Sequence, residues 1–259
     1  MASGVTRYTD TVDVAGVVFR LSCRFPKPSF WARRHPRFIS RGHPDVTVQI
    51  EYDDNWRRTR RSMGDTVSDA ADVRRDGRCL LVSTGYYRAE VDVERGRVSV
   101  RLAAGFEVSG LMRTLAALWL LERGTVLLNA ACFGSAASAT LACRLEGGLV
   151  PSSAVAGWLA VTPLANEVRV RSTPFVERDA PLRSRAARPT MLWLPGSAPV
   201  SRSIGAAPAL LALLPAIWQA DRRRAAVERT LDLATRIVTA LECREVGMIS
   251  GPAEEALVG

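Results

Sequence analysis

Alternation of apolar and polar positions in the first third of the chain predicts a β-rich region. Every second residue over Tyr87–Val93 is apolar, which is typical of a strand with one buried face. Turns are expected at Gly85 and at Arg95–Gly96, so that neighbouring strands form a meander. We expect strands within Val12–Cys23, Val46–Tyr52, Arg78–Ser83, Tyr86–Val93 and Arg97–Leu102, and loops over Pro26–Pro44 and Asp53–Asp72.

The pattern changes to a helical period near residue 107. Apolar residues recur three and four positions apart between Val108 and Trp119, which predicts a helix over Glu107–Glu122 that ends at Gly124. Thr125–Cys132 follows as a continuous apolar run, which is typical of a buried strand.

The last hundred residues mix short strands with two predicted helices. The helix over Ala206–Trp218 is apolar almost all round, so we expect it to be buried, with an interruption near Pro215. The helix over Arg222–Leu241 carries an apolar stripe at Val227, Leu231, Ala234, Val238 and Leu241. Further strands are expected at Glu167–Val170, Thr190–Leu194 and Cys243–Ile249. The pattern predicts a mixed α/β fold, with a β-rich region over residues 1–105 and a second domain over 106–259.

Composition is that of a folded chain outside the membrane. Of the 259 residues, 47% are hydrophobic and 24% are charged, so the chain can bury a core. No apolar run reaches the about 18 residues that a spanning helix needs. Met1–Asp10 lacks the pattern of a signal peptide. We therefore expect a soluble, cytoplasmic protein with no membrane partner.

Arginine supplies nearly all of the positive charge, because Lys27 is the only lysine and the net charge is +9. Clusters occur at Arg57, Arg58, Arg60 and Arg61, and at Arg222, Arg223 and Arg224. They could bind phosphates or an acidic peptide. Because no aromatic residues are interleaved with them, the pattern disfavours nucleic acid and favours a solvated basic face.

Cysteine and histidine positions exclude several kinds of site. The five cysteines, Cys23, Cys79, Cys132, Cys143 and Cys243, never stand at CxxC spacing, so neither a zinc site nor a disulfide framework is expected. The two histidines, His35 and His43, both lie in the N-terminal region. No catalytic triad is therefore expected in the second half of the chain.

Several short segments in the second half match a known family in composition and order. They are Leu118–Gly124, Val126–Ala130, Thr173–Glu177, Ala180–Arg183 and Leu213–Trp218. From Gly110 onward the chain resembles the HPr kinase/phosphorylase-like family, in particular its small members from peptide natural-product clusters. The resemblance implies a P-loop phosphotransferase fold, also seen in PEP carboxykinase, for the second domain.

The stretch that corresponds to the family's phosphate-binding loop departs from its pattern. Such a loop needs glycines, a lysine charge and a Ser or Thr that binds magnesium. Over Gly134–Ala142, family glycines are replaced by Ser135 and Ala137, and the family lysine by Ser138. Thr140 remains near the metal-binding hydroxyl position. Because alanine does not readily adopt a positive φ, we expect a reshaped loop.

Other groups that the family uses for phosphotransfer are also replaced. Asn129 stands at the position of the family's histidine, and Ser152 and Ser153 stand at the positions of its paired aspartates. These losses remove both positioning and charge stabilisation. We therefore expect no P-loop phosphotransfer, no bound metal and no cofactor.

The remaining polar residues have two interpretations. A hydroxyl-lined pocket, with Asn129 as an amide donor and acceptor, is one interpretation of Ser135, Ser138, Thr140, Ser152 and Ser153. Small residues that fill a collapsed loop are favoured. Glu177 could act as an acid or base, but an ion pair with Arg178 or Arg183 is favoured. Four tryptophans could line a ligand pocket, but core packing is favoured: Trp119, Trp158, Trp193 and Trp218.

These observations leave three hypotheses for function. The first is a degenerate kinase-like protein that binds a peptide or small-molecule intermediate, or a partner enzyme, in natural-product biosynthesis, either alone or as a homo-oligomer. The alternative is an enzyme that reuses the emptied nucleotide pocket for metal-free, ATP-independent cyclisation or isomerisation. The third and weakest is nucleic-acid binding through the arginine clusters, which steep salt dependence would support.

Overall fold

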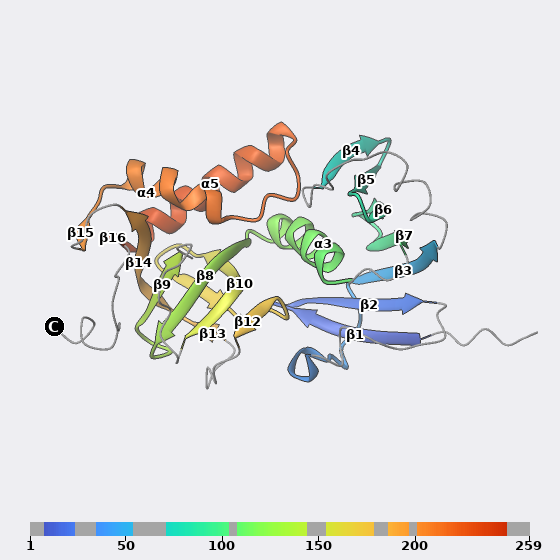
Figure 1. Cartoon of the computed structure of the whole chain (residues 1–259), viewed down its shortest axis with the longest axis horizontal. Coiled ribbons are helices and arrows are strands. Elements are labelled where there is room, and N and C mark those ends of the chain that lie inside the picture. The colour runs from blue at the N-terminus through green and yellow to red at the C-terminus, as the bar shows by residue number, and fades with distance from the viewer. Residues whose placement is uncertain are drawn as a thin grey trace, which may run out of the picture. The chain divides into compact units, whose positions relative to one another are not determined.

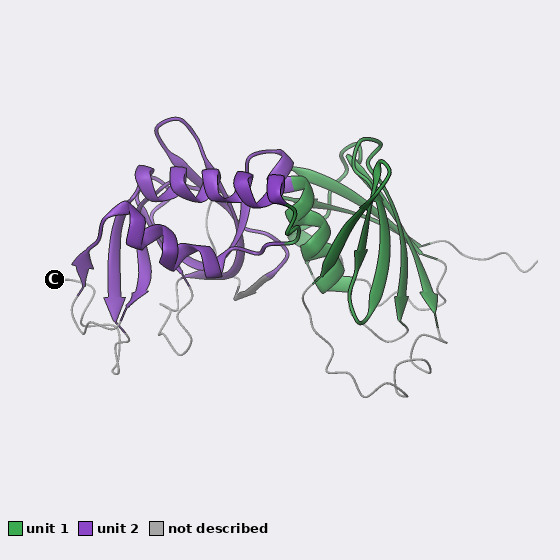
Figure 2. Ribbon diagram, turned by 90° about the horizontal axis from the view of Figure 1, so that it is seen from above, with its two compact units in different colours: residues 1–119, 220–223 green, residues 120–219, 224–259 purple. Residues whose placement is uncertain are grey.

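The structure is a computed structural model that describes residues 8–23, 35–53, 71–103, 108–143, 154–178, 186–196 and 201–247, without the side chains of 176–178. The described part is mixed α/β and rich in strands, with two mixed sheets and few helices, as the sequence predicts. By its contacts the chain divides into two units (Figure 2), which are described separately below. Unit 1 is Met1–Trp119 with Ala220–Arg223, and unit 2 is Leu120–Gln219 with Arg224–Gly259.

Unit 1 is built on one sheet, called the N-terminal sheet, whose described strands run in the order β1-β2-β3-β7-β6-β5-β4 (Figure 1). The strands are β1 Tyr8–Val14, β2 Val17–Cys23, β3 Val46–Asp53, β4 Asp72–Asp76, β5 Cys79–Ser83, β6 Tyr87–Asp92 and β7 Arg97–Ala103. β3 is parallel to β2 and β7, and the other neighbouring pairs are antiparallel. A short 3-10 helix, η1, spans Pro36–Phe38.

The expected strands are confirmed, with two differences. The segment Val12–Cys23 contains a hairpin rather than a single strand, because Ala15 and Gly16 turn the chain with φ angles of 53° and 92°. Asp72, expected at the end of a loop, begins strand β4, which pairs with β5. Residues 54–70 of that expected loop lie outside the described part.

Helix α3, Val108–Glu122, packs on one face of the N-terminal sheet (Figure 2). The rings of Trp119 on α3 and Phe19 on β2 meet edge to face, with centroids 6.1 Å apart. The Tyr87 hydroxyl on β6 donates a hydrogen bond of 3.1 Å to Thr114 Oγ1 on α3. Because side chains alternate along each strand, the sheet has an apolar face toward α3 and a polar face on the other side.

Unit 2 is built on a second sheet, called the C-terminal sheet, with the described order β13-β11-β10-β8-β9-β14-β16-β15 and β12 paired with β10. The strands are β8 Val126–Gly134, β9 Ala139–Cys143, β10 Val155–Pro163, β11 Val168–Arg171, β12 Val176–Arg178, β13 Ala186–Ala187, β14 Pro189–Gly196, β15 Arg202–Ser203 and β16 Glu242–Gly247. β14 is parallel to β9 and β16.

Helices α4, Ala206–Leu213, and α5, Arg224–Ala240, lie on one face of the C-terminal sheet (Figure 1). The short 3-10 helix η2, Leu214–Ala216, follows α4 and confirms the expected interruption at Pro215. Together with β8, β9, β10 and β14, the helices enclose a core that includes Leu128, Leu159 and Ile237. None of the described helices is long and apolar enough to cross a membrane.

One expectation for these helices is wrong, and one is confirmed only in part. Helix α4 is not buried: of its residues only Ala209 and Leu213 are buried, and Leu211 is 72% exposed. Helix α4 forms an outer layer, and no second layer of described residues covers its outer apolar side chains. In α5 the expected stripe is confirmed at Ala234 and Val238 and wrong at Leu231, which is 37% exposed. The buried residues are Thr230, Leu233, Ala234, Ile237 and Val238.

Candidate functional site

The stretch Gly134–Ala142, compared above with a phosphate-binding loop, forms the turn of a β-hairpin and the start of strand β9. Gly134 pairs with Ala139 at the turn, and Ser135 and Ser138 are exposed between them. Gly134 has a φ of 105°, and an added Cβ would lie 2.8 Å from the carbonyl oxygen of Ser138. The chain then continues as strand β9. The dipole of a helix N-terminus is therefore absent at this turn in the described structure.

The backbone N–H groups around the hairpin turn donate hydrogen bonds to other atoms of the protein. The N–H of Ser135 donates to the carbonyl oxygen of Ser138 at 3.1 Å, and the N–H of Ser138 donates to Ser135 Oγ at 3.0 Å. The N–H of Ala139 donates to the carbonyl oxygen of Arg188 at 3.2 Å. A phosphate cradle works by aiming such N–H groups at the anion. These three groups are already occupied.

Asn129 lies in the middle of β8, away from the hairpin turn. Its neighbours Leu128 and Ala130 point into the core under the helices, so Asn129 faces the other side of the sheet, opposite Trp158 on β10. Its Oδ1 is buried and has no hydrogen-bond partner among the described residues. Five residues of strand, roughly 17 Å, separate it from Gly134. The structure therefore does not bring Asn129 and Ser138 together.

The other predicted polar residues are only partly described. Glu177 lies in β12, between Val176, which pairs with Gly157, and Arg178, which pairs with Ala156. Its side chain is outside the described part of the structure. Ser152 and Ser153 are also outside the described residues, whereas Thr140 is on β9, half-buried and paired with Phe133.

All four tryptophans named from the sequence pack against another aromatic ring. Trp158 and Trp218 meet edge to face with centroids 5.1 Å apart. Trp193 meets Phe133 at 5.4 Å, and its Nε1–H donates to the sulfur of Met191 at 2.8 Å. Trp119 packs on Phe19, as described above. The ring contacts fit the packing interpretation.

The second arginine cluster is largely paired within the protein. Arg223 donates from Nε and Nη2 to the buried carboxylate of Asp221, with a shortest distance of 2.6 Å. Arg224 donates to Glu228 at 2.7 Å. Two of the three arginines therefore have intramolecular acidic partners, which weakens the case for a phosphate-binding patch there. The first cluster, Arg57–Arg61, lies outside the described residues.

The thiols are mostly buried and hard to ionise. All five cysteines are described, and none forms a disulfide. Burial raises the pKa of Cys132 to about 11. Burial, with a smaller effect of Cys243, raises the pKa of Cys143 to about 12. In the described part of the chain, no group of three or more His, Cys, Asp or Glu side chains is arranged to hold a metal.

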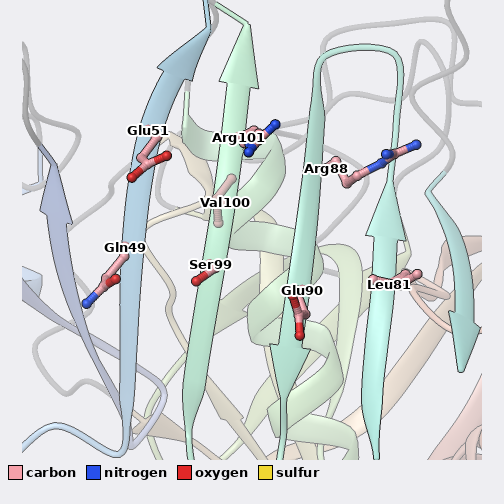
Figure 3. Close-up of a pocket in the computed structure, with 8 residues that line it drawn as sticks. All are labelled: Gln49, Glu51, Leu81, Arg88, Glu90, Ser99, Val100 and Arg101. Atoms are coloured by element: carbon pink, nitrogen blue, oxygen red, sulfur yellow. The ribbon is translucent and has the colours of Figure 1, made fainter. Parts of the chain in front are cut away.

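Within the described part of the chain, a hollow on the polar face of the N-terminal sheet is a candidate binding site (Figure 3). It has a volume of about 440 Å³, within the range of roughly 300–1,000 Å³ that ligand sites occupy. Strands β3, β5, β6 and β7 form it (Figure 3). Its lining residues are Gln49, Glu51, Leu81, Arg88, Glu90, Ser99, Val100 and Arg101.

Charges of both signs meet in this hollow. Arg101 on β7 is in register with Glu51 on β3 on one side and with Arg88 on β6 on the other. Within the described structure, none of these three side chains forms an ion pair. Glu90 lies beside the thiol of Cys79, whose pKa is raised by burial first and then by Glu90.

Sequence reasoning did not find this hollow. Alternation over Tyr87–Val93 already predicts that Arg88 and Glu90 point away from the core. The parallel pairing of β3 with β7 brings Glu51 to the same row, and no sequence signal gives that register.

Comparison with known proteins adds no relative: no model of a protein family matches the chain, and no curated protein matches it.

Proposed function

We propose that this chain is a binding protein that transfers no phosphate and that holds a peptide in the hollow of the N-terminal sheet. Its setting would be natural-product biosynthesis, as the family resemblance implies. One observation carries the proposal: the hollow presents Glu51, Arg88 and Arg101 without ion-pair partners among the described residues.

The hairpin supports the absence of phosphotransfer. A P-loop holds phosphates with backbone N–H groups, a lysine and the N-terminus of a helix. Here the N–H groups of Ser135, Ser138 and Ala139 are used inside the protein, and a strand follows the turn. Ser138 stands where the family has its lysine. Each of the three contributions to phosphate binding is thus missing at this position.

The chemistry of the hollow suits a peptide better than a small apolar ligand. Pockets for small molecules are lined mainly by apolar and aromatic side chains. This hollow is lined by charged groups, the hydroxyl of Ser99 and the amide of Gln49, and its aliphatic side chain on this face is Leu81. A peptide carries charged side chains of both signs, and its backbone amides can bond to hydroxyl and amide groups.

Titration calorimetry on the whole chain tests the proposal. The probe is a peptide of repeated Gly-Glu-Thr-Lys units with an amidated C-terminus, and the comparison ligand is ATP with magnesium. We expect heat of binding for the peptide and none for ATP. Ser99→Trp fills the centre of the hollow and should abolish peptide binding. Thr9→Trp lies three strands away in the same row and should leave it unchanged.

Magnesium-dependent ATP binding would contradict the claim that the protein transfers no phosphate. Peptide binding that survives Ser99→Trp, or no peptide binding at all, would contradict the claim that the hollow holds a peptide.

The alternative, an enzyme with metal-free chemistry, is favoured by one observation. Asn129 has a buried Oδ1 without a described hydrogen-bond partner, beside Trp158 on the neighbouring strand. Such an acceptor could orient a substrate group. Chromatography with mass spectrometry after incubation with the probe peptide would support the enzyme if an isomerised or cyclised product appeared. That product should be absent with Asn129→Leu. Unchanged peptide would rule out this activity on the probe.

A further inference from the structure

We infer that Arg88 and Arg101 together bind a carboxylate of the peptide, so that the hollow selects acidic segments. This inference rests on the proposed peptide-binding function and adds the chemical group that is recognised. The carboxylate could come from an aspartate or glutamate side chain, or from the C-terminus of the peptide.

The register of the N-terminal sheet places these two cations directly opposite each other. Arg88 on β6 pairs with Arg101 on β7, in antiparallel strands, so both side chains are on the same face. In the other strand pairings that the structure describes, each arginine faces a neutral or acidic residue. Arg97, on the same strand as Arg101, faces Asp92. The like-charge pair is therefore specific to the hollow.

A like-charge pair opposes folding unless something neutralises it. Opposed residues have Cβ atoms about 4.5–5.5 Å apart, and like-charged side chains at directly opposed positions are destabilising. In Figure 3 the Arg88 side chain extends toward β5, away from Arg101, as this repulsion favours. An anion between the guanidinium groups would convert the repulsion into two attractions. Carboxylates suit this position, because a guanidinium presents paired N–H donors that match the two carboxylate oxygens.

The acidic residues of the hollow limit where that carboxylate can lie. Glu51 stands beside Arg101 in the same row, and Glu90 stands two residues from Arg88 on the same face of β6. Both would repel an anion placed near them. The favourable position is therefore between the two arginines, and a basic group of the peptide is favoured at either glutamate.

Fluorescence anisotropy with a labelled peptide on the whole chain tests this inference. The reference probe is the amidated Gly-Glu-Thr-Lys repeat, and the neutral probe has Gln in place of each Glu. A third probe is the neutral peptide with a free C-terminal carboxylate. The variants are Arg88→Gln and Arg101→Gln, with Arg97→Gln as the matched control on the same strand.

We expect the reference probe to bind roughly tenfold to hundredfold more tightly than the neutral probe, because the neutral probe cannot form the charge-assisted hydrogen bonds. Arg88→Gln and Arg101→Gln should each remove most of this difference, whereas Arg97→Gln should retain it. Binding of the third probe at the reference affinity would assign the site to a C-terminal carboxylate. Weak binding of the third probe would assign it to acidic side chains.

Two outcomes would overturn the inference. Equal binding of the acidic and neutral probes would show that no carboxylate is recognised, while the peptide-binding function would stand. An equal loss of affinity in Arg97→Gln would show a general effect of positive charge rather than a specific pair. If none of the probes bound, the proposed function itself would fail together with this inference. A lowered melting temperature would identify a misfolded variant. For Arg88→Gln we expect a raised melting temperature instead, because the repulsion is removed.

Discussion

Arg88 and Arg101 face each other across β6 and β7, and neither forms an ion pair with a described residue. Without ligand, Arg88→Gln should therefore raise the free energy of unfolding, by about 0.2–1 kcal/mol. Arg97→Gln should lower it by at most a similar amount, because Arg97 faces Asp92, whose carboxylate is already paired with Arg95. Urea unfolding of the two variants and the wild type measures both changes. Changes of the same sign would show that cross-strand charge does not govern these positions.

Gly134 is needed for the turn of the hairpin between β8 and β9. Its φ is 105°, and an added Cβ would lie 2.8 Å from a backbone oxygen of Ser138. We expect Gly134→Ala to destabilise the protein by about 1–3 kcal/mol. Gly110→Ala is the matched control, because Gly110 lies in α3 with nothing within 4 Å of an added Cβ. It should stabilise the protein by about 0.5–1 kcal/mol.

Thermal unfolding measures both variants. A lower melting temperature for Gly134→Ala and a higher one for Gly110→Ala would support the geometry of the turn. A neutral or stabilising effect of Gly134→Ala would contradict the hairpin geometry.

Helix α4 presents one buried and one exposed leucine for comparison. Leu213 is fully buried against the C-terminal sheet, whereas Leu211 is 72% exposed. Leu213→Ala should lower the free energy of unfolding by about 2–5 kcal/mol. Leu211→Ala should change it by less than about 0.5 kcal/mol. Chemical denaturation tests the pair, and comparable losses would mean that Leu211 is covered in solution.

Cys143 gives stability a dependence on alkaline pH. Its ordinary pKa of 9.0 is raised in the folded state to about 12, mainly by burial. Between these values the unfolded chain loses the thiol proton while the folded chain keeps it. Stability from this group is therefore complete below pH 9 and is lost as the pH rises toward 12.

The slope due to Cys143 cannot exceed about 1.4 kcal/mol per pH unit, the value for one proton. Comparing the pH dependence of urea unfolding for the wild type and Cys143→Ala isolates it. We expect the fall in stability above pH 9 to be shallower in Cys143→Ala. Identical slopes would contradict the burial of this thiol.

Local patterns in the sequence predicted the elements well but not their environment. Alternation and helical periodicity located β6 and α3, because each pattern reports one buried face. The same reasoning failed for α4, since apolarity on all sides does not show whether a second layer covers the helix. The candidate site was missed because Glu51 and Arg101 meet through a parallel pairing that depends on the whole fold.

Chemical-shift mapping tests the central claim most directly. The whole chain, labelled with ¹⁵N, is titrated with the amidated Gly-Glu-Thr-Lys peptide while backbone amide resonances are followed. We predict that the shifted resonances cluster in the strand segments that form the hollow, at Gln49–Glu51, Leu81, Arg88–Glu90 and Ser99–Arg101. Shifts concentrated instead at Val126–Cys143, around the hairpin, would contradict the account and return the binding site to the C-terminal sheet.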